Sequence, residues 1–86
     1  MRLLVVEDDL PLAEALTTLL TSSGYAVDCV HDGPSAEALA AVERFDLVIL
    51  DLNLPEMDGL AVLNAMRGRS NPAAVMILTA RGSAED

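Results

Sequence analysis

Short apolar runs alternate along this chain with longer amphipathic stretches. Four runs are rich in Val, Ile and Leu and predict buried strands: Leu3–Val6, Tyr25–Val30, Asp46–Leu50 and Ala74–Leu78. The stretches between them repeat apolar residues at intervals of three and four, which is typical of helices. Strands that alternate with helices predict parallel strands joined by right-handed crossovers, and therefore an α/β fold with a doubly wound sheet.

The first amphipathic stretch predicts a helix with recognisable ends. Asp9 suits the N-cap position, and Pro11 is tolerated in the first turn. Gly24 suits the left-handed conformation just past the helix end. The apolar stripe that we expect to pack on the sheet contains Leu12, Leu16, Leu19 and Leu20.

Two further helices are predicted by similar signals. Pro34 lies near the first position of the second helix, which we expect to end near Arg44. Asp58 suits the N-cap of the third helix, and Gly59 opens it. The apolar face of the third helix is expected to contain Leu60, Val62, Leu63 and Met66. Asp28 is the one charge in the second strand and predicts that this strand lies at a sheet edge.

Composition narrows the class of protein. The 86 residues suffice for one domain and carry fourteen acids against five arginines, with no lysine and a net charge of −9. This balance argues against direct nucleic-acid binding by these residues. The apolar runs are too short to cross a bilayer, no secretory leader is evident, and the single Cys29 fits a reducing compartment. We therefore expect a cytoplasmic domain without membrane contact, in which His31 is a solvated turn residue.

Acids follow two of the predicted strands at their carboxyl ends. Glu7 and Asp8 follow the first strand, Asp51 ends the third, and Thr79 follows the fourth. In a sheet of order 2-1-3-4 the first and third strands are neighbours, and the strand order reverses between them, which opens a ligand crevice. We therefore expect the three carboxylates to converge there, with the hydroxyl of Thr79 beside them.

The expected carboxylate cluster indicates a particular chemistry. Carboxylates a few ångströms apart repel and raise one another's pKa, so a bound cation would stabilise them. Oxygen ligands suit Mg²⁺, whereas zinc prefers the His and Cys that this cluster lacks. A divalent cation beside a nucleophilic carboxylate and a hydroxyl is typical of phosphoryl transfer.

Four segments together resemble the receiver domains of two-component response regulators. They are LLVVEDD at 3–9, DGPSAEAL at 32–39, DLVILDLNLPEMDG at 46–59 and MILTAR at 76–81. The resemblance is closest to regulators with a winged-helix DNA-binding output domain. It implies a flavodoxin-like receiver fold and a phosphoacceptor module that a histidine kinase phosphorylates to switch transcription. Such a module is not an enzyme, beyond self-catalysed phosphorylation and dephosphorylation.

The resemblance assigns roles to individual residues. Asp51 matches the phosphoacceptor, and Asp8 matches the direct Mg²⁺ ligand. Glu7 matches the acid that assists the metal, often through water. Asn53 matches the residue whose backbone carbonyl coordinates the metal, and Thr79 matches the switch hydroxyl.

The family pattern also contains parts that this chain lacks. Receiver domains have a fifth strand that ends in an essential lysine, and two further helices, so we expect residues 1–86 to form a partial receiver domain. DNA contact would need an output domain that is absent here. The strand at 74–78 then becomes a sheet edge, and Val5, Ile49, Val75, Ile77 or their neighbours would be poorly covered. We therefore expect self-association, or binding of a complementary segment.

Three alternatives remain beside the signalling module. Phosphatases of the haloacid dehalogenase type also use a strand-end aspartate and Mg²⁺, but they need a second Asp where this chain has Asn53. A calcium loop at 51–62 would need a glycine in place of Glu56 and a glutamate in place of Val62. The last alternative is a structural fragment that is prone to association and has an incomplete site.

Overall fold

The computed structural model describes residues 1–52, 54, 59–69 and 71–78. In chain order the elements are β1 (Arg2–Val6), α1 (Leu10–Ser22), β2 (Ala26–Val30), α2 (Gly33–Val42), β3 (Leu47–Asp51), α3 (Gly59–Gly68) and β4 (Ala74–Leu78). The four strands form one parallel sheet in the order β2-β1-β3-β4. The predicted fold class and strand order are confirmed, and β2 is an edge strand.

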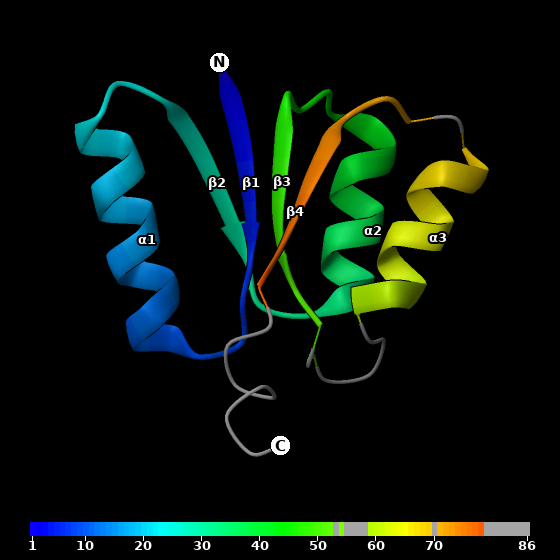
Figure 1. The fold of residues 1–86 in the computed structure, drawn as a ribbon, viewed down its shortest axis with the longest axis horizontal. Helices are drawn as coiled ribbons and strands as arrows, with labels where there is room; N and C mark the ends of the chain where they lie inside the picture. The colour runs from blue at the N-terminus through cyan, green and yellow to red at the C-terminus, as the bar shows by residue number, and fades with distance from the viewer. Residues whose placement is uncertain (53, 55–58, 70, 79–86) are drawn as a thin grey trace.

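The helices form two layers around the sheet. Figure 1 shows α1 on one side of the sheet and α2 and α3 together on the other. The main core lies between the sheet and the α2–α3 layer. It contains Leu4, Val6, Ala36, Ala40, Phe45, Val48, Leu50, Leu54, Val62, Met66 and Ala73. β1 and β3 are the two central strands, so each has a neighbouring strand on both sides.

The ends of α1 follow the signals in the sequence. The Asp9 side chain accepts a hydrogen bond from the Leu12 backbone N–H at 3.2 Å, and Pro11 lies in the first turn. Past the C-terminal end, Gly24 has a φ of +98°, which only glycine adopts without strain. The helix start and stop predicted from Asp9, Pro11 and Gly24 are therefore confirmed.

The buried stripe of α1 differs from the prediction. Leu12 and Leu19 are 42% and 61% exposed, whereas Ala13 is buried and Leu16 and Leu20 are partly buried. The stripe that faces the sheet is thus centred on Ala13, Leu16 and Leu20, at intervals of three and four. The prediction was wrong for Leu12 and Leu19 because it counted only leucines, and the small Ala13 is what faces the sheet.

The other helices agree better with the predicted patterns. In α3 the pair Val62 and Met66 is buried and Leu63 is partly buried, but Leu60 is exposed to solvent. Helix α2 ends at Val42, earlier than predicted, because Glu43 adopts an extended conformation. Within the described residues no helix is long and apolar enough to cross a membrane.

Side chains on the two central strands are more buried than the sequence predicted. Val5 and Ile49 are buried, so the prediction that they would be poorly covered was wrong. These two residues are cross-strand neighbours in β1 and β3 and shield one another. On β4, by contrast, Met76 is 51% exposed, and Val75 and Ile77 are only partly buried.

Candidate functional site

Glu7 is the first residue past β1 and is held there by the end of β2 and the N-cap of α1. Its backbone N–H donates to the carbonyl of Val30 at the end of β2, at 3.1 Å. Its Oε2 accepts the backbone N–H of Asp9, the N-cap of α1, also at 3.1 Å. The residue is only 2% exposed. Glu7 is therefore a buried acid whose backbone and side chain are both fixed.

Asp51 is the last residue of β3 and is 4% exposed. The start of α3 lies directly against it, since the Gly59 backbone N–H donates to the carbonyl of Leu52 at 3.0 Å. A Cβ added at Gly59 would lie 2.6 Å from the Asp51 carbonyl oxygen and 2.7 Å from the Leu52 Cα. Only glycine allows this approach, a requirement that the sequence pattern did not reveal.

The strand order brings Glu7, Asp8 and Asp51 together. One carboxylate oxygen from each lies within 4.8 Å of the others. Asp8 is exposed, whereas Glu7 and Asp51 are buried, so the cluster opens to solvent on the Asp8 side. Asn53 and Thr79, the other two residues predicted for the site, lie outside the described residues, and their roles stay predictions.

The electrostatics of the cluster centre on Glu7. The pKa of Glu7 is raised to about 7, chiefly by burial, with smaller contributions from the hydrogen bond and negative charge of Asp51 and from the charge of Asp8; the Asp9 N–H acts in the opposite direction. Three adjacent carboxyl groups supply only oxygen ligands, which is the donor set that Mg²⁺ prefers. A divalent cation would offset the repulsion between the three carboxylates, so these residues fit Mg²⁺.

His31 is a neighbour of the site that the sequence did not indicate. It is exposed, as predicted for a turn residue, but its Nδ1 lies 3.0 Å from the carbonyl oxygen of Glu7. The register pairs Val6 with Val30, so His31 follows the end of β2 just as Glu7 follows the end of β1. Its place directly after a strand that neighbours the acidic site was the one signal available in the sequence.

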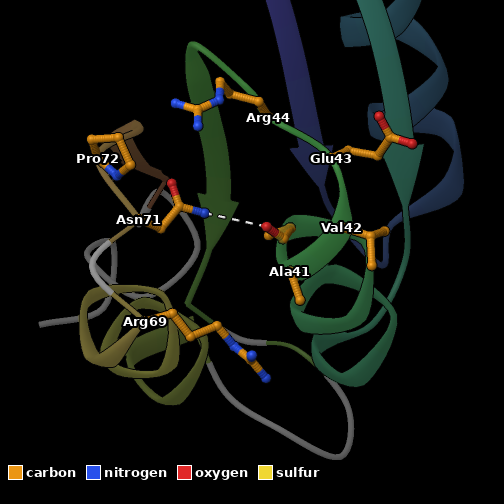
Figure 2. Close-up of a pocket in the computed structure, with 8 residues that line it drawn as sticks. Ala41, Val42, Glu43, Arg44, Arg69, Asn71 and Pro72 are labelled. Atoms are coloured by element: carbon orange, nitrogen blue, oxygen red, sulfur yellow. Dashed lines mark hydrogen bonds between the residues drawn. The ribbon is translucent and has the colours of Figure 1, made fainter.

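A separate pocket of about 260 Å³ lies at the opposite end of the sheet (Figure 2). It is formed by the C-terminal end of α2 and the segment before β4, where the Asn71 side-chain amide donates to the Ala40 carbonyl at 3.3 Å. Arg69, which also lines it, is paired with Glu37. Among the described site residues, neither Glu7, Asp8 nor Asp51 lines this pocket, which is therefore separate from the carboxylate cluster.

A family model and two related proteins show which family the chain is similar to. A family model described as the response regulator receiver domain matches residues 3–86. The transcriptional regulatory protein TctD of Salmonella typhimurium is 45% identical over 86 residues, which are 100% of this chain and 38% of that protein. The transcriptional regulatory protein PmrA of Pectobacterium parmentieri is 46% identical over 86 residues, 100% of this chain and 39% of that protein. The chain thus spans under two fifths of these relatives.

A solved structure is similar in fold. The receiver domain of the sensor histidine kinase PA1611 from Pseudomonas aeruginosa superposes with a TM-score of 0.91 at 31% identity. The match covers 99% of this chain and 71% of that one. That structure is described as having a magnesium ion coordinated in its active-site cleft.

Proposed function

The chain belongs to the response regulator receiver family of two-component signalling, and on that premise we propose that Asp51 accepts the phosphoryl group. The observation that carries this proposal is the convergence of Asp51 with Glu7 and Asp8 within 4.8 Å at the carboxyl ends of β1 and β3. This edge is where open α/β sheets bind their ligands. Asp51 ends the central strand β3, where it pairs with Leu78 of β4, one residue past the last pair with β1.

The proposed step is an in-line transfer to a carboxylate. An oxygen of ionised Asp51 attacks phosphorus, and the bond from phosphorus to the phosphohistidine nitrogen of a kinase breaks, leaving its electron pair on the imidazole. The chemistry that Mg²⁺ supplies when bound is neutralisation of the phosphoryl oxygens. Glu7, Asp8, Asp51 and the backbone carbonyl of Asn53 would hold it. The Thr79 hydroxyl then donates to a phosphoryl oxygen.

We place this module in a longer regulator that a histidine kinase phosphorylates and that acts on transcription. The names of TctD and PmrA support this placement, since both are transcriptional regulatory proteins. The net charge of −9 argues against DNA contact through these residues, so we assign DNA contact to a separate winged-helix output domain. We infer a cytoplasmic protein that accepts a phosphoryl group without turning over a substrate, apart from self-catalysed phosphorylation and dephosphorylation.

Magnesium should stabilise the protein through the acidic site. A cation that binds only the native state adds RT ln(1 + [L]/Kd), so a site with Kd of about 1 mM adds about 1.4 kcal/mol at about 10 mM Mg²⁺. For a domain of this size the melting temperature should rise by about 5–10 °C. We expect Asp8→Asn to remove most of this rise, as measured by thermal melts with and without Mg²⁺.

The control for this experiment is Glu14→Gln, which removes an exposed acid of α1 that is not in the cluster. This variant should retain the full Mg²⁺ response. A wild-type melting curve that Mg²⁺ does not move would show that the acidic site does not bind the ion.

We also propose that the 86-residue polypeptide self-associates through β4, or binds a complementary segment there. In the described sheet β4 is an edge strand without a charged residue, and Ala74 and Met76 are exposed on it.

Sedimentation equilibrium should show dimers or larger species. Met76→Lys should shift the population toward monomer, because a charge on an edge strand opposes pairing. Val42→Lys, an exposed apolar position on α2, is the matched control. A single monomeric wild-type species would refute the proposal.

A further inference from the structure

We propose that His31 is a positioning residue, which holds Glu7 in the orientation that the acidic site needs for a divalent cation. The inference rests on the proposed cation site and adds to it a residue outside the carboxylate cluster. The geometry behind it is the Nδ1 of His31, 3.0 Å from the Glu7 carbonyl oxygen. A carbonyl oxygen only accepts, so Nδ1 carries the proton and donates it.

This hydrogen bond continues the β1–β2 ladder past the ends of both strands. The last residue pair is Val6 with Val30, and the Glu7 N–H donates to the Val30 carbonyl at 3.1 Å. In a parallel ladder the Glu7 carbonyl would next accept a backbone N–H from the partner strand. Here the chain turns into α2 at its N-cap Asp32, and the imidazole of His31 supplies the donor instead. Both backbone groups of Glu7 are thereby fixed to the end of β2.

The bond from His31 matters because the clustered carboxylates of the site repel one another. Glu7 is buried beside Asp51, and Asp8 adds a third acid within 4.8 Å, so repulsion favours moving Glu7 away when all three carboxyl groups are ionised. The Asp9 N–H holds Oε2 of Glu7, but Asp9 belongs to the loop that leads into α1. The bonds to Val30 and His31 are the ones that fix the backbone of Glu7 to the end of β2. Loss of the His31 bond should therefore loosen the ligand set before any cation arrives.

His31 suits a variant experiment because its side chain is exposed. It lines an open pocket of about 310 Å³ between α1 and β2, so substitutions there are accommodated without repacking the core. His31→Phe retains an aromatic ring but removes the donor. His31→Asn removes the ring but places an amide N–H close to where Nδ1 lies. The two variants separate the hydrogen bond from the bulk of the ring.

Two measurements test the proposal. The Glu7 N–H is bonded to the Val30 carbonyl, and its exchange rate reports how easily this segment opens. In the cation-free protein this rate should be about three- to tenfold faster in His31→Phe than in wild type, because the segment is then held by one hydrogen bond fewer. The Mg²⁺ dissociation constant should rise by a similar factor. His31→Asn should return both values close to wild type. Equal exchange and affinity in His31→Phe and wild type, or an Asn variant as impaired as Phe, would overturn the proposal.

The exchange measurement separates this inference from the proposed function. If the wild-type protein fails to bind Mg²⁺, the cation site is refuted, but exchange at Glu7 is measured without the ion and still decides whether His31 holds that residue. Faster exchange in His31→Phe, restored in His31→Asn, would then support the anchoring alone. An unchanged rate would refute the anchoring whether or not Mg²⁺ binds.

Discussion

Asp51→Asn should abolish phosphorylation of this protein by a small acyl phosphate or by a kinase phosphohistidine. The amide has the shape of the carboxylate but lacks its nucleophilic oxygen, so no acyl phosphate can form. Asp51 is 4% exposed at the end of β3, and the amide occupies the same space. Incubation with acetyl phosphate and Mg²⁺, followed by mass measurement of the intact protein, should show the phosphoryl adduct in wild type and none in Asp51→Asn.

The matched control is Asp46→Asn, at the residue just before the start of β3. Asp46 is exposed and accepts the Arg2 backbone N–H at 2.8 Å, a bond that the oxygen of an asparagine can also accept. This variant should accept the phosphoryl group as wild type does. An Asp51→Asn protein that still gains one phosphoryl group would place the acceptor at another residue.

Stability of the cation-free protein should fall as the pH rises from about 4.5 to about 7. Unfolded Glu7 loses its proton near its ordinary value of 4.5, whereas its folded pKa is raised to about 7, chiefly by burial. Between these values the folded state binds more protons, so each rise in pH favours unfolding. The loss is complete above the folded pKa, and its size is at most on the order of 3 kcal/mol.

Urea unfolding from pH 4.5 to 8 in the presence of a chelator measures this slope. Glu7→Gln should flatten it, while Glu14→Gln on the exposed face of α1 should leave it unchanged. Asp32 does not interfere, because hydrogen bonds from Ser35 lower its pKa, and its contribution is lost only at more acidic pH. Millimolar Mg²⁺ should also flatten the slope. A wild-type stability that is constant from pH 5 to 7 would contradict the buried, proton-holding Glu7.

The strands, their order and the sheet edge that carries the site were predictable from local patterns. Apolar runs of strand length alternate with amphipathic stretches, and right-handed crossovers leave few possible topologies. Asp51 could be identified because it ends a strand that is apolar on both faces. Strand positions and strand-end residues follow from the spacing of residue types along the chain. The same is true of Gly24, whose positive φ just past α1 was predicted from its place after the helix.

Tertiary packing decided which side chains are buried and how the acids interact. The rotation of α1 that buries Ala13 and exposes Leu19 depends on how closely the helix approaches the sheet, which periodicity does not specify. Burial of Val5 depends on its neighbours across the sheet in the same way. The raised pKa of Glu7 and its bond to His31 join residues from different elements. Their interaction energies depend on distance and desolvation, and these exist only once the strands have assembled.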